Sequence, residues 1–189
     1  MFQREEYAIV LDLMPYGKAG EAAREPVAQL IGETQFTLLE ATPKPDVKLA
    51  IGEKVYIGRG VRDKISRIRG RVTYNELTNA ARNEAERMIK QIIKEREKTF
   101  VEFFNRAGAI NIRAHTLEHI PSVGKKHLQA ILDAREQKPF ESFEDIQQRV
   151  PHLQKIDELL QERILHELTG DAKYYLFTKP PSRHYEEED

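Results

Sequence analysis

The chain has 189 residues, 40% of them hydrophobic, and this length suits two small packed modules. Its 30 Lys and Arg residues nearly balance 31 Asp and Glu residues, so the net charge of -1 says nothing about an anionic partner. The absence of cysteine excludes disulfides and thiolate zinc sites, and no apolar run approaches the roughly 20 residues of a membrane span. Since the first residues lack a signal-peptide pattern, we expect a cytoplasmic protein without a membrane partner.

Residues 1–75 are predicted to form a small β-barrel. Five runs rich in β-branched and aromatic residues are separated by Gly and Pro turns, with no long helix between them. The runs are Tyr7–Leu13, Val27–Ile31, Phe36–Ala41, Ile51–Gly58 and Ser66–Tyr74. The strand count and glycine positions resemble the OB fold, and an SH3-like barrel is the alternative.

Basic residues gather at the end of this module, in a stretch whose single acid is Asp63. They are Arg59, Arg62, Lys64, Arg67, Arg69 and Arg71. On a strand, period two places the last three arginines on one face, and Gly70 predicts a gap or bulge. A row of guanidinium groups suits a phosphate backbone, with Tyr56 or Tyr74 as a stacking surface. The competing interpretation is a solvated face paired with acids on neighbouring strands.

Residues 76–108 are predicted to form one connecting helix about 45 Å long. Apolar residues recur at helical spacing along it, and Thr73 with Glu76 offers a capping box before it. Gly108 follows the pattern where a C-terminal cap is expected. A coiled-coil dimer is the alternative to a strut that packs on the barrel.

Residues 109–170 are predicted to contain two helical hairpins. The first joins a short helix with Ala114, Leu117 and Ile120 on its apolar face to a helix beginning near Lys125. The second begins at Ser142, which can cap a helix with Asp145 as the acid of the box, and turns at 150–154.

Two resemblances follow from these residues. The stretch 110–150 resembles the tandem helix-hairpin-helix domain of the bacterial competence DNA receptor. The residues that carry the resemblance are Ile110-Asn111, Pro121-Ser122-Val123-Gly124-Lys125-Lys126, Leu128–Arg135 and Pro139–Asp145. Over its whole length the chain resembles an uncharacterised archaeal family, domain of unknown function 655, in which an OB-like barrel is joined to this hairpin domain. The resemblance implies an α+β protein that binds nucleic acid and has no known reaction.

The first hairpin is the stronger candidate site. Its turn should point the backbone N–H groups of Gly124, Lys125 and Lys126 outward at a helix start, where free amides and the helix dipole favour phosphate. Ser122 and Val123 complete the predicted contact, and Ser122 stands where the family usually has glycine. The second hairpin has His152 and Gln154 at its glycine positions, so we expect it to be structural only.

One constellation points to catalysis. His115, Glu118 and His119 spell H-x-x-E-H, which on a helix puts two histidines one turn apart and is typical of one class of zinc proteases. No third ligand is marked, and no nucleotide-binding glycine loop occurs. The zinc hydrolase is therefore the last of three hypotheses, and we expect no cofactor.

Residues 171–189 are predicted to contain one more strand, at Lys173–Thr178, and an acidic tail that ends at Asp189. The first hypothesis for the whole chain is a non-enzymatic binder of RNA or DNA, with RNA favoured, that contacts the phosphate backbone without reading sequence. The second is a protein-interaction adaptor that contacts a ribosomal or polymerase component.

Overall fold

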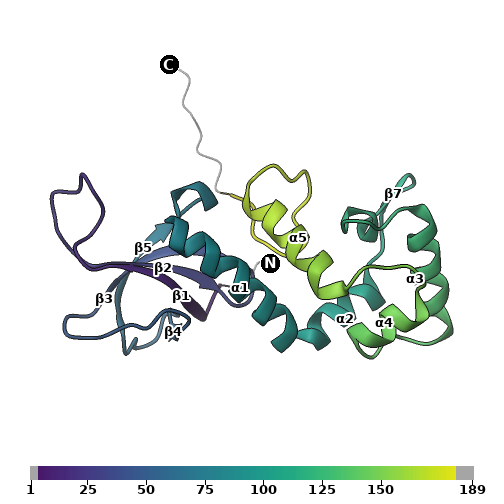
Figure 1. Ribbon diagram of the computed structural model, residues 1–189, viewed down its shortest axis with the longest axis horizontal. Coiled ribbons are helices and arrows are strands. Elements are labelled where there is room, and N and C mark those ends of the chain that lie inside the picture. Colours follow the sequence, from purple (N-terminus) through teal and green to yellow (C-terminus); the bar gives the residue numbers. More distant parts are fainter. Residues whose placement is uncertain (1–3, 182–189) are drawn as a thin grey trace, which may run out of the picture. The chain divides into compact units, whose positions relative to one another are not determined.

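The computed structural model describes residues 4–181, and the predicted acidic tail lies outside them. Figure 1 shows a mixed α+β chain, in which strands fill the first part and helices the second. The strands are β1 (Tyr7–Met14), β2 (Val27–Gly32), β3 (Leu38–Pro43), β4 (Lys54–Tyr56), β5 (Ile65–Arg71), β6 (Ala109–Asn111) and β7 (Ala114–His115). The α-helices are α1 (Asn79–Glu95), α2 (Glu97–Arg106), α3 (Lys125–Gln137), α4 (Phe143–Arg149) and α5 (Ile156–Leu168), and two 3-10 turns are η1 (Tyr74–Glu76) and η2 (Thr116–His119).

The chain divides into two compact units. The first consists of residues 1–85 and 166–189, and the second of residues 86–165. Both boundaries therefore fall inside helices, α1 and α5, rather than at the ends of the predicted connecting helix. Within the part of the chain that the structure describes, no helix is long and apolar enough to cross a membrane.

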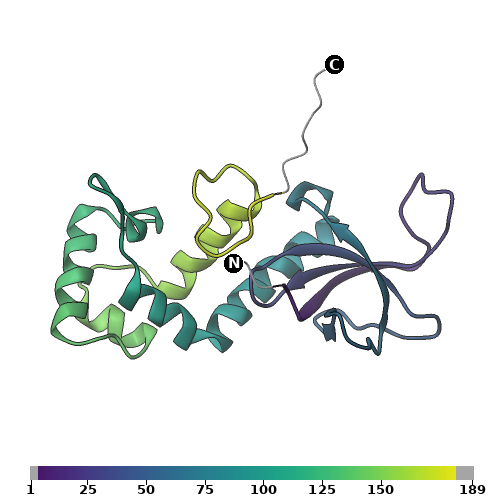
Figure 2. The ribbon, with the colours of Figure 1, turned by 180° about the vertical axis from the view of Figure 1, so that it is seen from behind.

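The first unit is built on a curled, five-stranded antiparallel sheet in the order β4-β1-β2-β3-β5 (Figures 1 and 2). The five predicted strands are confirmed. Bulges at Leu11 in β1 and at Ser66 and Arg69 in β5 shift the register, and such bulges increase the bend of a sheet. No pairing of β5 with β4 is found among residues 4–181, so the sheet is a half-barrel with two open edges.

The concave core of this sheet is entirely apolar. It consists of Ala8, Val10, Ala28, Leu30, Leu39, Ala41, Val55, Ile57 and Ile65. Residues of alternate parity along β1, β2 and β3 supply it, as expected of strands with one face turned to a core. Buried Gln29 faces the other way, where its amide donates to the Glu76 carbonyl (3.1 Å) and accepts from the Thr78 N–H (2.9 Å). These bonds hold the start of α1 on the sheet.

The predicted capping box is present but caps a different element. The Glu76 carboxylate accepts a hydrogen bond from the Thr73 N–H (2.7 Å), and this pair encloses the 3-10 turn η1. Helix α1 is instead capped by Thr78, whose hydroxyl accepts from the Ala81 N–H (3.0 Å). The chain therefore makes one extra turn before the helix starts.

The predicted single helix over 76–108 is wrong. Arg96 leaves helical geometry, with φ -107° and ψ 28°, and separates α1 from α2. Helix α2 then buries Phe100, Val101 and Phe104, whereas α1 buries Ile89, Ile92 and Ile93 in the same unit. A helical repeat of apolar residues continues through Arg96, so periodicity alone could not reveal the break.

Residues 173–178 form no strand, which corrects the prediction for this segment. Side-chain contacts fix it instead. Buried Glu167 accepts hydrogen bonds from the N–H groups of Phe177 and Thr178, both at 3.0 Å, and from the Thr178 hydroxyl (3.1 Å). The aromatic residues that suggested β structure are half-buried beside the end of α5 in the first unit.

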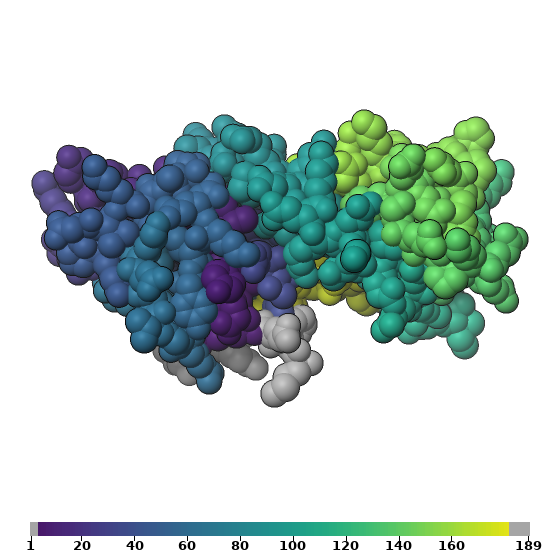
Figure 3. Space-filling view, turned by 90° about the horizontal axis from the view of Figure 1, so that it is seen from below, coloured from purple at the N-terminus to yellow at the C-terminus, as the bar shows by residue number. Residues whose placement is uncertain are grey.

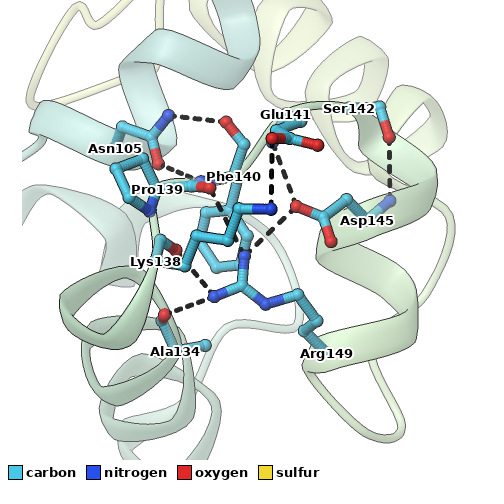
Figure 4. Close-up of polar contacts among 9 residues, drawn as sticks. All are labelled: Asn105, Ala134, Lys138, Pro139, Phe140, Glu141, Ser142, Asp145 and Arg149. Carbon is cyan, nitrogen blue, oxygen red and sulfur yellow. Dashed lines mark hydrogen bonds and ion pairs between the residues drawn. The ribbon is translucent and has the colours of Figure 1, made fainter.

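In the second unit, Arg149 joins α3 to α4 (Figure 4). Its guanidinium donates to the carbonyl of Lys138 (2.6 Å), which follows α3, and pairs with Asp145 (3.1 Å). It also lies 4.8 Å from the centre of the Phe140 ring. Asn105 on α2 exchanges two hydrogen bonds with the backbone of Phe140, at 2.7 and 2.9 Å. In Figure 3 the green segments of this unit form one continuous surface.

Candidate nucleic-acid interface

The first hairpin, residues 120–126, is a tight turn anchored by buried apolar side chains. Ile120 and Val123 are buried, and the Val123 N–H donates to the Ile120 carbonyl (3.1 Å). Buried Arg163 on α5 donates to the carbonyl of His119 (3.2 Å), directly before the turn. The base of the hairpin is therefore fixed, while its tip faces solvent.

Ser122 occupies the left-handed region of the backbone, with φ +63°. A residue with a Cβ atom costs roughly 1–2 kcal/mol there, which explains why glycine suits this position. The serine is exposed, and its carbonyl lies 2.9 Å from a ring nitrogen of His127. The chain therefore keeps the turn without glycine.

Gly124 is the N-terminal cap of α3 and has an ordinary extended conformation, with φ -86° and ψ -173°. A Cβ atom added there would meet nothing within 4 Å. The fold thus does not require glycine at this position. What glycine provides is open space beside the amides at the helix start.

The amides at the start of α3 are available. Gly124, Lys125 and Lys126 are exposed, and within residues 4–181 nothing accepts a hydrogen bond from their N–H groups. Unpaired amides and the positive end of a helix dipole together attract anions. The predicted placement of these three residues is therefore found in the structure.

The charges on this first turn oppose the helix. Lysines at a helix start are unfavourable by about 0.3–1 kcal/mol each, and the first turn of α3 contains no acid. Helices α2, α4 and α5 each carry acids in the first turn. A bound anion would reverse this unfavourable term.

A second hairpin at 150–155 repeats the backbone of the first. His152 has φ +63°, as Ser122 has, and Val150 and Leu153 are buried like Ile120 and Val123. The following helix starts differently. Buried Ile156 is its first residue, and Asp157 and Glu158 follow in the first turn. The charge at this helix start disfavours phosphate.

The three arginines of β5 do not form one row. The bulge predicted at Gly70 is present, with Arg69 as the extra residue, so the alternation of side chains breaks there. Arg67 binds Glu25 (2.6 Å) and Arg69 binds both oxygens of Glu21 (2.7 Å), two acids of the β1–β2 loop. The hydrogen bond between Arg69 and Glu21 lowers the pKa of Glu21 below its usual value and raises the pKa of Arg69.

Arg71 behaves differently from its two neighbours. Its guanidinium donates to the carbonyls of Lys179 (3.0 Å) and Pro180 (2.9 Å) in the C-terminal segment. Burial lowers the pKa of this guanidinium, and no carboxylate offsets the effect. The β5 arginines thus contact two separate segments of the first unit.

Two residues of the rest of the predicted basic patch have partners within the first unit. Lys64 forms an ion pair with Glu53, and the Arg62 guanidinium donates to the Gly58 carbonyl (2.9 Å). Arg59 is exposed. Tyr56 packs edge-on against Tyr7, with the ring centres 5.4 Å apart and an angle of 66° between the ring planes. The two rings therefore do not form a flat surface for base stacking.

The H-x-x-E-H residues cap a 3-10 turn with their hydrogen bonds. His115 precedes the four-residue 3-10 turn η2, so the two histidines do not lie one α-helical turn apart as predicted. The His115 ring nitrogen accepts from the Leu117 N–H (3.1 Å), and Glu118 accepts from the His115 N–H (2.8 Å). Burial and the nearby Arg135 lower the pKa of His115. Across residues 4–181, no group of three acidic, His or Cys side chains could hold a metal.

Sequence reasoning missed the β6–β7 ribbon. Ile112 at its tip is 105% exposed, and Arg113 beside it is also exposed. The Asn111 side chain accepts from the Arg113 N–H (2.8 Å), which fixes the tip. The ribbon and the start of α3 both rise toward the upper side of the unit in Figures 1 and 2. Strands of two or three residues leave no period to detect.

Comparisons with known proteins agree with the archaeal resemblance. A family described as "Protein of unknown function (DUF655)" matches residues 4–179. The uncharacterized protein MJ0038 of Methanocaldococcus jannaschii is 43% identical over 177 residues, which are 93% of this chain and 80% of that protein. The crystal structure of Af1531 from Archaeoglobus fulgidus, assigned to the same family, has a TM-score of 0.84 at 45% identity and covers 93% of this chain and 100% of its own.

Proposed function

Because the chain belongs to the DUF655 family, whose function is unknown, we propose its function from the first hairpin: a non-enzymatic protein that binds RNA or DNA through the phosphate backbone. The observation that carries the proposal is the start of α3. Two lysines, an open glycine and unpaired amides meet there on an exposed helix end. Contacts of this kind recognise phosphate without reading base sequence.

The two architectures support the same proposal at a finer level. We interpret the paired turns, each with a left-handed residue between buried anchors, as a tandem helix-hairpin-helix domain in which one copy binds. We interpret the half-barrel as OB-like, since joining β5 to β4 would close its five strands into a ring. Such barrels serve single-stranded nucleic acids, which makes RNA the first ligand to test.

The β5 arginines stay a prediction as a second contact surface. A phosphate there would have to displace Glu25 from Arg67 and Glu21 from Arg69. Both acids lie on the exposed β1–β2 loop. The exposed Arg67–Glu25 pair contributes little, about 0–1 kcal/mol, so a phosphate can displace Glu25 with a small loss of free energy, whereas the Arg69–Glu21 pair is half-buried. Binding through both units would then raise the affinity of a weak hairpin.

The test is a titration of single-stranded RNA, duplex RNA and duplex DNA at several salt concentrations. Wild-type affinity should fall steeply with salt, and Lys125→Glu with Lys126→Glu should weaken it by about tenfold or more. The matched control, Lys48→Glu with Lys98→Glu, changes net charge equally at exposed lysines away from the hairpin. Equal affinity of the two double variants would contradict the proposal.

Gly124→Ala separates a binding surface from a structural turn. The added methyl group meets no protein atom, so the fold should be retained. If phosphate approaches the amides closely, the methyl group blocks it and affinity falls about threefold or more. Unchanged melting temperature with reduced binding is the expected result.

One observation favours the adaptor as a second candidate. Ile112 and the 38% exposed Ile110 place apolar surface on the β6–β7 ribbon, which suits a protein partner such as a ribosomal or polymerase component. Ile112→Ser should then abolish partner capture and leave RNA affinity unchanged. Loss of RNA affinity in this variant would assign the ribbon to the nucleic-acid surface instead.

A further inference from the structure

A cavity of about 300 Å³ in the first unit combines an apolar wall with cations. Leu39, Ile57 and Ile68 form the wall and belong to or pack against the core of the sheet. Arg4, Arg71 and Lys179 line the same cavity. Ligand pockets for small organic molecules have this size and this mixture of apolar surface with a few charged groups.

Arg71 is the key group because its guanidinium, on an exposed residue, has no carboxylate partner within residues 4–181. Two of its five N–H donors bind backbone carbonyls, and within residues 4–181 the other three have no acceptor. Partial desolvation lowers the pKa of this guanidinium, and neutral carbonyls compensate the desolvation only in part. A guanidinium in this state favours a bidentate anion such as phosphate.

The other two cations reinforce this preference. Across the described part of the chain, neither Arg4 nor Lys179 has a carboxylate partner within ion-pair distance, in contrast to Arg67 and Arg69 on the neighbouring strand. The cavity thus collects three cations and one carboxylate, that of Glu5, and none of the three cations forms an ion pair within residues 4–181. Their effect on an anion adds because they line one pocket.

The single acid of the cavity, Glu5, is held by backbone hydrogen bonds. Buried Glu5 accepts hydrogen bonds from the N–H groups of Thr34 (2.9 Å) and Gln35 (2.7 Å) in the β2–β3 turn. A side chain at Gly32 would overlap the Glu5 carboxylate, so this glycine makes room for it. The acid is therefore fixed in the protein and does not reach out to pair with the cations.

We propose that this cavity binds a nucleotide that carries a free phosphate group, with the phosphate on Arg4, Arg71 and Lys179 and the base against the apolar wall. The site uses none of the hairpin residues, so it extends the proposed function without depending on them. A phosphate monoester has two sources, a free nucleoside monophosphate or the phosphorylated end of a strand. The geometry of three cations around one opening suits both.

The experiment is a calorimetric titration of the full chain with AMP, adenosine and an RNA octamer that carries either a 5′-phosphate or a 5′-hydroxyl group. The proposal predicts at least about tenfold tighter binding of AMP than of adenosine, or of the phosphorylated octamer than of its hydroxyl form. Preference in the AMP pair identifies a free nucleotide, and preference only in the octamer pair identifies a strand end. Absence of both preferences would overturn the proposal.

Variants locate the binding. Arg71→Gln and Lys179→Gln should each reduce the phosphate preference about tenfold or more. Lys179 donates no side-chain hydrogen bond within residues 4–181, so its variant tests the site even if loss of Arg71 loosens the C-terminal segment. Arg24→Gln is the control, since Arg24 is exposed on the β1–β2 loop and does not line the cavity. Wild-type preference in a folded Lys179→Gln variant would contradict the proposed site, whatever the lysine pair of the hairpin does to duplex binding.

Discussion

The two hairpins of the second unit share a backbone and differ in chemistry. Ser122 and His152 have the same φ of +63°, and buried apolar residues flank each of them. The helix after the first turn starts with two exposed lysines. The helix after the second starts with buried Ile156, followed by two acids. The same turn can therefore serve as a ligand site or as a packing element.

Helix dipoles explain which of the two helix starts, that of α3 or that of α5, is the more stable. The acids at the start of α5 stabilise that helix, as is usual for a helix start in a folded core. The lysines at the start of α3 give up this stabilisation. A fold selected only for stability would have acids in the first turns of both α3 and α5. The lysines in the first turn of α3 are therefore consistent with selection for binding an anionic ligand. The predictions below test this difference.

The largest effect is expected where the hairpins are joined, at Arg149. Arg149→Met keeps the aliphatic stem but leaves the carbonyl of Lys138 without this donor and the carboxylate of Asp145 with the Glu141 N–H alone. We expect unfolding free energy to fall by about 2–3 kcal/mol, because hydrogen bonds to charged groups are lost in a half-buried position. Chemical denaturation measures it.

Lys138→Met is the matched control for that substitution. Lys138 forms an exposed ion pair with Glu141 (3.2 Å), and exposed pairs contribute about 0–1 kcal/mol. If the two variants lose equal stability, Arg149 does not join the repeats and α3 and α4 are held by apolar packing alone.

A charge graft should convert the second hairpin into a weak binder. Gln154→Gly opens the backbone beside Lys155, and Glu158→Lys replaces an acid of the first turn by a cation. We expect RNA affinity to rise about threefold to tenfold with a steeper salt dependence, because one more phosphate contact becomes available. Helix stability should fall by about 1 kcal/mol.

The graft has an informative negative outcome. Unchanged affinity would show that buried Ile156, which stands where the first hairpin has Lys126, keeps the amides of this helix start out of reach. The difference between the hairpins would then lie in burial rather than in charge. Gln154→Ala with Glu158→Gln is the control, since it removes the acid without adding a cation or opening the turn.

The sequence predicted the strands and the helix starts better than it predicted the contacts between distant side chains. The five strands, the Ser142 cap and the hairpin amides follow from local patterns, and the Ser142 hydroxyl accepts from the Asp145 N–H (3.0 Å) as expected. The partners of the β5 arginines could not be predicted, because Glu21 and Glu25 lie more than 40 positions away in the chain. The break at Arg96 is equally hidden, since packing and not pattern decides it.

A smaller effect tests the shared backbone of the turns. Ser122→Gly and His152→Gly each replace a left-handed residue by the one that adopts this region freely. We expect each to stabilise the protein by about 0.5–1 kcal/mol, because the relieved strain exceeds the added entropy of the unfolded chain. Differential scanning calorimetry should show similar shifts for both. A gain at only one position would mean that the side chain of the other contributes to its turn.

The smallest expected effect is a loss of stability at low pH that arises at Asp145 on α4. The N–H of Glu141 and the guanidinium of Arg149 lower the pKa of Asp145 below its ordinary value of 3.8. A carboxyl group whose pKa is lowered by folding adds stability above its ordinary pKa, and that contribution disappears as the pH falls through the lowered value. Wild type should therefore lose stability below about pH 4 more steeply than Asp145→Asn does.

Amide exchange locates this acid effect. Asp145 lies on α4, the helix that leads into the second hairpin, and residues 120–126 of the first hairpin contain no acid. Acid should therefore increase exchange in α4 before it does so at the start of α3. Simultaneous loss of protection in both helices would show that the two hairpins unfold as one cooperative unit, and that they differ only in what their surfaces bind.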